Sequence, residues 1–309
     1  MFISVVIPLK DEEENVAKLH KEIKDVFKKR RLKGEFIFVD DGSGDRTLKA
    51  MKKLKPIKIV SFRKNFGQTA AMDAGIKEAK GDVIVTMDGD LQNDPSDIPK
   101  LIEKMKEGFD VVSGWRKKRM DSFMKKFFSR GANFLRGILI KDGIQDSGCS
   151  LKAYKKECFD GVDLYGEMHR FIPATLKIKG FKIGEVVVNH RPRVAGATKY
   201  DFKRAFKGFL DMLSVWFWRK FASRPLHLFG FFGMVCSFVG FVLLVWMFVA
   251  KVFWYQPIGN RIWPIMGIFL VLAGTQFFIF GLLADILVKT FHRVRGERPY
   301  NIKEIIERK

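Results

Sequence analysis

The chain has 309 residues, enough for one large domain or two smaller ones. Its 56 Lys and Arg against 34 Asp and Glu give a net charge of +22, which favours anionic partners such as a membrane face, a phosphorylated substrate or nucleic acid. The three cysteines have neither paired nor metal-type spacing, which argues against a disulfide framework and indicates a reducing compartment. The N-terminus MFISVVIPLKDEEEN has no basic leader with a long apolar core, so it does not resemble a signal peptide.

The first 200 residues alternate short apolar runs with helical patterns. Five runs rich in Val, Ile and Phe predict strands: ISVVIPL (3–9), EFIFVD (35–40), IKIVSF (57–62), DVIVTMD (82–88) and FDVVSGW (109–115). Between them, helices are predicted around 16–27, over 68–80 and over 95–107. This alternation predicts an α/β domain with a mainly parallel sheet, whose ligands should bind at the carboxyl ends of the strands.

Acidic residues follow two of these predicted strands. Asp40 and Asp41 end the second strand, and the DGD turn at 88–90 follows the fourth. No GxGxxG follows the first strand, no P-loop pattern occurs, and an EF-hand starting at Asp88 fails at its sixth and twelfth positions. A D-x-D turn can share a hard cation, Mg²⁺ or Mn²⁺, whose other ligands come from water and a substrate diphosphate. Asp94 precedes Pro95 at a helix start, so we expect it to cap that helix.

Two long apolar runs dominate the second part of the chain. Residues 226–250 carry no formal charge, and residues 262–288 are interrupted by Gln276 and Asp285. Each exceeds the roughly 20 residues that cross a bilayer core, so we expect an antiparallel transmembrane hairpin. Lys and Arg flank the outer ends more than the short link, which places the N-terminal region and the tail in the cytoplasm. Asp285 either snorkels toward water or is a functional intramembrane carboxylate.

The predicted organisation has four parts. We expect residues 1–200 to form the cytoplasmic α/β domain, 226–288 to hold the two spans, and 289–309 to form a basic cytoplasmic tail. Between them, residues 201–225 carry apolar side chains at three- and four-residue steps with Lys and Arg interspersed. That pattern predicts an amphipathic helix that either lies in the membrane interface or packs on its own domain.

Six ordered motifs carry a resemblance to a known family: VVIPLKDEEENV (5–16), FVDDGSGDRT (38–47), RKNFGQTAAMDAGIKEAKGDVIVTMDGDLQNDP (63–95), DSGCSLKAY (146–154), GEMHRFIPA (166–174) and NHRPRVAGATKY (189–200). In their order and in the two spans that follow, the chain resembles the inverting glycosyltransferase family 2, of GT-A fold. It is most similar to the membrane-anchored polyprenyl-phosphate glycosyltransferases of the bactoprenol-phosphate and dolichol-phosphate mannose synthase types.

The resemblance implies roles on the donor side. The nucleoside would be held by Pro8, Glu12, Asp40 and Asp41, and the donor would also contact Gly67 and Gln68 at the start of a helix. Mg²⁺ or Mn²⁺ and the donor diphosphate would be bound by Asp88, Asp90 and Gln92, with Asp90 serving catalysis through the metal. Lys10 stands where many relatives carry an aromatic residue and Asp11 where Asn is usual, which leaves the identity of the base open.

The resemblance also implies roles on the acceptor side. Asp146 would act as the base or would orient the substrate. Arg191, Arg193 and Lys199 would bind the acceptor phosphate, or would only attract anionic lipid head groups. His169 and Arg170 would line the acceptor or sugar pocket.

The implied function is metal-dependent transfer of one sugar from a nucleotide sugar to a polyprenyl phosphate at the cytoplasmic face of the membrane. By analogy with two-span relatives the donor is a UDP-sugar, with GDP-mannose as the alternative, and a homo-oligomer is possible. A processive polymerase should carry a Q-x-x-R-W segment, where this chain has only VWFWRK. A nucleic-acid-binding protein should cluster its basic residues with aromatics, which this chain does not do. A non-catalytic scaffold would keep the same residues, so only turnover separates it from an enzyme.

Overall fold

The computed structural model describes residues 1–117, 143–162, 164, 168–192, 217, 225–254 and 262–295. It divides into two units, Met1–Trp216 and Phe217–Lys309, each of which is described by itself. The predicted juxtamembrane helix lies outside the described residues except at 217 and 225, as does most of the predicted tail.

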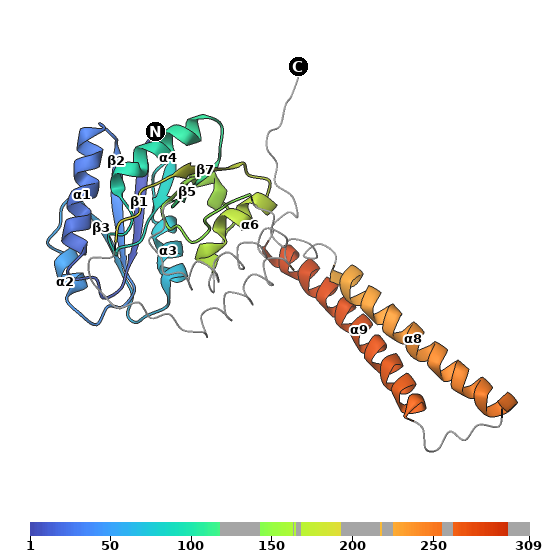
Figure 1. The fold of residues 1–309 in the computed structure, drawn as a ribbon. Coiled ribbons are helices and arrows are strands. Elements are labelled where there is room, and N and C mark those ends of the chain that lie inside the picture. Colours follow the sequence, from blue (N-terminus) through green and yellow to red (C-terminus); the bar gives the residue numbers. More distant parts are fainter. Residues whose placement is uncertain are drawn as a thin grey trace. The chain divides into compact units, whose positions relative to one another are not determined.

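The first unit is built on a seven-stranded sheet in the order β3-β2-β1-β4-β6-β5-β7 (Figure 1). Its strands are β1 (Ile3–Leu9), β2 (Gly34–Asp40), β3 (Lys58–Ser61), β4 (Val83–Thr86), β5 (Val111–Trp115), β6 (Lys152–Lys155) and β7 (Ile183–Val187). Every pairing is parallel except those of β6, which runs antiparallel to both β4 and β5. The five predicted strands and the mainly parallel α/β class are confirmed, whereas β6 and β7 were not predicted.

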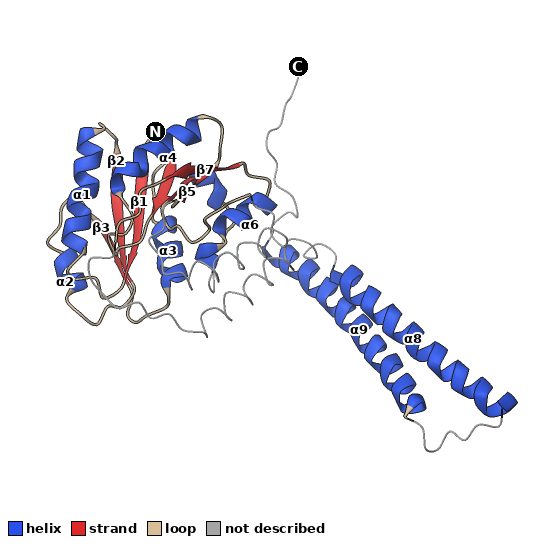
Figure 2. Cartoon of the chain, in the orientation of Figure 1, coloured by secondary structure: helices blue, strands red, loops and turns tan. Residues whose placement is uncertain are grey.

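Helices cover both faces of this sheet (Figure 2). The α-helices are α1 (Val16–Lys29), α2 (Thr47–Met51), α3 (Gln68–Lys77), α4 (Ile98–Lys106) and α6 (Ile172–Ile178), with short 3₁₀ turns at η1 (Pro95–Asp97), η2 (Lys156–Phe159) and η3 (Met168–Arg170). The helices predicted at 16–27, 68–80 and 95–107 are confirmed, the last as η1 followed by α4. The single turn of α2 was not predicted, because five residues are too few to show a helical period.

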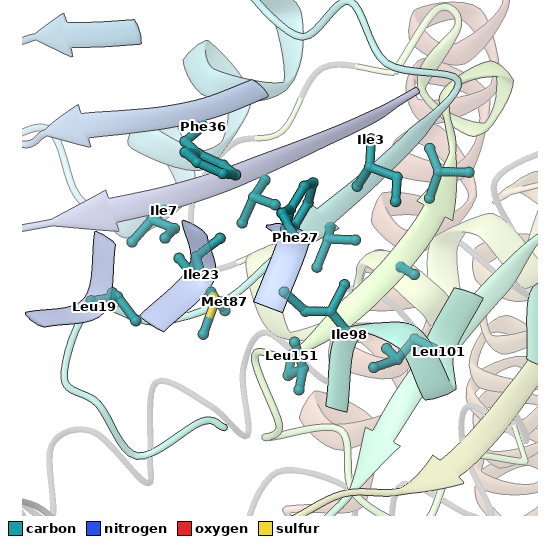
Figure 3. Packing of buried hydrophobic residues seen from close by; sticks show 14 of the residues in the cluster. Ile3, Ile7, Leu19, Ile23, Phe27, Phe36, Met87, Ile98, Leu101 and Leu151 are labelled. Atoms are coloured by element: carbon teal, nitrogen blue, oxygen red, sulfur yellow. The ribbon is translucent and has the colours of Figure 1, made fainter. Parts of the chain in front are cut away.

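The two faces of the sheet form separate apolar clusters. On one face Ile3 and Ile7 of β1 pack with Leu19 and Ile23 of α1 and with Ile98 at the start of α4 (Figure 3). The other face is covered by α3, whose apolar side chains pack against those of the strands. The residues in contact are Ala71, Met72 and Ile76 of α3 and Val6, Ile37, Val39 and Ile84 of the sheet. Strand β1 is buried along its whole length, as expected for a central strand covered by helices on both faces. Full burial of each large aliphatic side chain contributes about 1.5–3 kcal/mol.

Close packing fixes α3 on the sheet. A Cβ on Gly75 would lie 2.4 Å from Cγ1 of Val6, so only a glycine lets this helix approach β1 so nearly. Helix α3 is thereby fixed on β1 and β2, and its start is joined to Asp41 after β2, where predicted ligand-binding residues lie.

The second unit is a pair of helices, α8 (Pro225–Trp254) and α9 (Trp263–Arg295), that pack against each other. Glycines let the two backbones touch: a Cβ on Gly240 would lie 2.7 Å from the carbonyl oxygen of Gly267, and one on Gly274 would lie 2.5 Å from that of Gly233. Pro225–Phe253 and Trp263–Val288 are long and apolar enough to cross a membrane, and they match the predicted spans. Many large side chains on their outer surfaces are exposed, among them Phe238, Phe248 and Leu287. Such a surface indicates membrane association.

Candidate active site

The DxD turn leaves β4 at the carboxyl edge of the sheet. Asp88 is held from two sides: Nε2 of Gln68 donates to its Oδ1 at 2.7 Å, and its own N–H donates to Oγ of Ser150 at 3.2 Å. Asp90 is buried, and its Oδ1 accepts from the N–H of Gln92 at 3.2 Å. Gln68 opens α3 and Ser150 precedes β6, so three elements separated along the chain meet at the turn.

Backbone geometry holds this turn in place. A Cβ on Gly89 would lie 2.2 Å from Cδ2 of Leu9, so glycine is required where the turn passes the end of β1. Leu91 adopts φ 62° although it is not a glycine, and its side chain is buried. A bulky residue in this conformation costs about 1–3 kcal/mol, and the surrounding contacts must supply that energy.

The charges of the turn favour a cation. Burial, and then repulsion from Asp90, raise the pKa of the partly exposed Asp88, since two carboxylates this close resist being ionised together. Among the described residues, no three His, Cys, Asp or Glu side chains come together to form a metal site by themselves. Asp88, Asp90 and the amide of Gln92 therefore offer a partial set of oxygen ligands. Such a set fits Mg²⁺ or Mn²⁺, which take further ligands from water and substrate phosphates.

Asp146 forms a bidentate ion pair with Arg116, the residue after β5. Nε of Arg116 donates to Oδ2 of Asp146 at 2.7 Å, and Nη2 donates to Oδ1 at 2.9 Å. The backbone N–H of Arg116 also donates to Oδ2, at 3.2 Å. Although burial alone would lower the pKa of Arg116, hydrogen bonding and charge attraction from Asp146 raise it, with a further contribution from Asp88. Both oxygens of Asp146 are thus engaged by a permanent cation, which favours an orienting role over that of a free base.

Sequence reasoning missed Arg116 and also Lys152, the first residue of β6. Lys152 is buried, and its Nζ donates to the carbonyl oxygen of Ser147 at 3.1 Å. Asp146 and Asp88 interact electrostatically with it, so Lys152 lies near the same acidic residues as Arg116. Lys152 belongs to the motif DSGCSLKAY, and its apolar flanks were the only sign that it is buried. Cys149 itself is a buried thiol whose pKa burial raises to about 11, so it stays protonated.

The predicted nucleoside residues shape the loops after β1 and β2. Asp40 accepts hydrogen bonds from the N–H of Ser43 at 3.1 Å and from Oγ of Ser61 at 3.0 Å. Asp41 accepts from the N–H groups of Phe66 at 2.7 Å and of Gly67 at 3.0 Å. The two carboxylates therefore tie the loop after β2 to the loop that leads into α3. Gly67, with φ 96°, begins that helix in a conformation that favours glycine.

A second set of contacts joins the loop after β1 to the start of α2. The N–H of Glu12 donates to Oγ1 of Thr47 at 2.8 Å, and Asp11, with φ 56°, accepts from the N–H of Gly44 at 2.7 Å. Pro8 is buried within β1 opposite Val39 of β2. The structure thus brings Pro8, Glu12, Asp40 and Asp41 to one region of the sheet edge.

The later motifs contact α3 and α1. Nδ1 of His169 is hydrogen-bonded to Oγ1 of Thr69 in α3 at 2.8 Å, and Arg170 follows it in η3. Arg191 pairs with Glu22 of α1 at 2.6 Å and with Asp94 at 2.8 Å, so its guanidinium is occupied by carboxylates. Asp94 also accepts from the N–H of Ser96 at 2.9 Å, which confirms its predicted capping role. Arg193 and Lys199 lie outside the described residues.

The sequence model described as Glycosyl transferase family 2 matches residues 4–162. A dodecaprenyl-phosphate galacturonate synthase of Rhizobium johnstonii is 38% identical, over 99% of this chain and 93% of the relative. An undecaprenyl-phosphate 4-deoxy-4-formamido-L-arabinose transferase of Proteus mirabilis is 31% identical, over 98% of this chain and 94% of the relative. The chain belongs to glycosyl transferase family 2.

Solved structures share the fold of the first unit. The glucosyl-3-phosphoglycerate synthase from Mycobacterium tuberculosis, in complex with Mn²⁺, UDP and glucosyl-3-phosphoglycerate, aligns with a TM-score of 0.56 and 18% identity. The alignment covers 71% of this chain and 79% of that one. The same enzyme is also known in complex with Mg²⁺ and UDP, with 17% identity to this chain. The likeness confirms the GT-A fold.

Proposed function

We propose that this enzyme transfers one glycosyl unit from a nucleotide sugar to a polyprenyl phosphate, with inversion at the anomeric carbon. The observation that carries the proposal is the meeting of Asp88 and Asp90 with the Arg116–Asp146 pair at one edge of the sheet. Two relatives that match nearly the whole chain are named for polyprenyl-phosphate sugar transfer, which supports this acceptor class.

On the donor side, Asp88, Asp90 and Gln92 would hold Mg²⁺ or Mn²⁺ at the donor diphosphate. When bound, such a cation stabilises the negative charge of a departing nucleoside diphosphate. Asp40 and Asp41 would also accept hydrogen bonds from the nucleoside. A carboxylate has about four lone-pair sites, and the hydrogen bonds within the protein do not use all of them. We favour a UDP-sugar because the structural neighbours bind UDP and UDP-glucose.

On the acceptor side, the phosphate is already anionic near neutral pH, so its oxygen can attack the anomeric carbon without a strong base. The attack forms the new carbon–oxygen bond as the bond to the nucleoside diphosphate breaks. Asp146, held by Arg116, would orient the reacting groups in this step. Arg191, Arg193, Lys199, His169 and Arg170 remain the proposed acceptor-binding residues, and Arg191 would have to exchange Asp94 or Glu22 for phosphate.

The hairpin of α8 and α9 would anchor the enzyme beside its lipid acceptor. Basic residues before the first span and after the second favour a topology in which the catalytic unit and the tail are cytoplasmic. The product would then be a polyprenyl-phosphate-linked sugar on the cytoplasmic leaflet.

A phase-partition assay on the detergent-solubilised protein tests this function. Labelled UDP-glucose, UDP-galactose, UDP-galacturonic acid, UDP-N-acetylglucosamine and GDP-mannose are each offered with undecaprenyl phosphate, with Mn²⁺ or with EDTA. We expect label from one donor in the organic phase, abolished by EDTA and reduced more than about 100-fold by Asp90→Asn. Asp25→Asn, an exposed acid on α1, serves as the matched control. Label from no donor, with Asp90→Asn unchanged in nucleotide binding, would leave a non-catalytic scaffold as the better interpretation.

A further inference from the structure

A buried lysine with unused hydrogen-bond donors lies at the edge of the sheet that carries the candidate site. Lys152 begins β6 and is 3% exposed. Its Nζ donates to the carbonyl oxygen of Ser147 at 3.1 Å, and within the described part of the chain no other hydrogen bond or ion pair of this group is found. An ammonium has three N–H donors, so two remain unused. Burial of a charged group in this state is costly unless a further partner compensates it.

The residue beside Lys152 has the same feature. Because β5 and β6 are antiparallel, Ser113 lies directly opposite Lys152, and the two side chains share one face of the sheet. The hydroxyl of Ser113 is buried and has no hydrogen-bond partner among the residues that the structure describes. An unsatisfied hydroxyl beside this ammonium shows that the described residues leave hydrogen-bonding capacity unused at this position, and of the two side chains only that of Lys152 retains any exposure.

Register and charge connect Lys152 with both halves of the site. Lys152 lies opposite Thr86 of β4, two residues before Asp88 of the donor half, and its Nζ bonds to Ser147, which follows Asp146 of the acceptor half. Burial lowers the pKa of this ammonium, whereas Asp146 and Asp88 raise it. A sugar that passes from donor to acceptor must come near both carboxylates, and a group that interacts with both can contact it.

We propose that Lys152 contacts the transferred glycosyl unit, with Nζ donating hydrogen bonds to its oxygen atoms. This inference rests on the proposed function and adds a residue that determines how the sugar is held. The oxygen atoms can belong to sugar hydroxyls or to a carboxylate of a uronic acid. A carboxylate would form the stronger, charge-assisted bond.

The test compares the binding of UDP with that of UDP-sugars by titration calorimetry, on the full-length protein in detergent with Mn²⁺. The variants are Lys152→Met and Lys152→Gln, with Lys152→Arg to retain the charge. Lys155→Met is the matched control, since this lysine lies on the same strand but pairs with Asp110 at 2.7 Å, and Asp110 is none of the proposed site residues. The sugars offered are UDP-galacturonic acid, UDP-galactose and UDP-glucose.

We expect Lys152→Met to weaken the binding of the UDP-sugar about 10- to 100-fold and to leave the binding of UDP unchanged. A loss confined to UDP-galacturonic acid identifies a carboxylate contact, and a similar loss for the neutral sugars identifies hydroxyl contacts. Lys152→Arg should recover part of the loss. The melting temperature should not fall, because methionine replaces a buried charge with an apolar group of similar size.

Two results would overturn the inference. One is a Lys152→Met or Lys152→Gln protein that binds the UDP-sugar as tightly as the wild type, and the other is an equal loss for UDP and UDP-sugar, which would indicate a structural role. In both cases the wild type still binds the donor, so the proposed function survives. A wild type that binds no nucleotide sugar at all would refute the proposed function and this inference with it.

Discussion

The ion pair between Arg116 and Asp146 permits a quantitative prediction. The Arg116 side chain is 12% exposed and that of Asp146 is 5% exposed, and three hydrogen bonds from Arg116 end on this carboxylate. Arg116→Met removes two of them and leaves a buried carboxylate without its cation, which costs about 3–5 kcal/mol. At about 2–4 °C per kcal/mol for a domain of this size, the melting temperature should fall by roughly 10 °C.

A double-mutant cycle separates this explanation from a general packing defect. Asp146→Leu alone leaves a buried guanidinium unpaired and should destabilise the protein by a similar amount, whereas Arg116→Met with Asp146→Leu removes both charges and should lose far less than the sum. Thermal unfolding of the four purified proteins in one detergent measures the coupling. If the two single losses simply add in the double variant, the pair does not act as a unit and the reasoning is refuted.

Three further predictions follow from the charges, the glycines and the cap. Asp88→Asn should raise the melting temperature of the metal-free protein at neutral pH and abolish metal-dependent donor binding. Because the pKa of Asp88 is raised in the folded state, its carboxylate destabilises the fold only when the pH exceeds the ordinary pKa of an aspartate, so the gain in melting temperature should vanish near about pH 4. Gly274→Leu should separate α8 from α9 and make the hairpin sensitive to protease, whereas the exposed neighbour Thr275→Leu should not; equal sensitivity would contradict the role of the glycine contact. Asp94→Ala should lower the free energy of unfolding by about 1 kcal/mol through loss of the cap, while Asp94→Asn should keep most of it, and denaturant unfolding would detect a cap that contributes nothing.

Local pattern was enough to predict most of the first unit. The strands β1, β2 and β4 are short apolar runs that end at acidic turns, and each is buried over most or all of its length. Their hydrophobic pattern and composition therefore agree with the tertiary structure. Strand β6 has the sequence KAYK, in which lysines open and close the run, and only its apolar neighbours distinguish the buried Lys152 from the half-exposed Lys155. Strand β7 includes a glycine and a glutamate, which weakens its signal in the same way.

Part of the candidate site could be predicted from local sequence, and part of it depends on the tertiary structure. Asp88 and Asp90 lie together in the sequence, and the chemistry of a D-x-D turn is local, so the metal-binding hypothesis could be formed without a structure. The partner of Asp146 could not be found in this way, because Arg116 lies 30 positions away. The two meet only because β6 enters the sheet in reverse between β4 and β5, a topology that no local pattern encodes.

That reversed strand has a consequence for stability. Since β5 runs toward the edge of the sheet that carries the candidate site and β6 runs away from it, the end of β5 and the start of β6 lie at the same edge, where Arg116 and Asp146 pair. The entropy cost of bringing two points of a chain together depends only weakly on the number of residues between them. The ion pair should therefore hold this edge together with little dependence on the length of chain that separates Arg116 from Asp146.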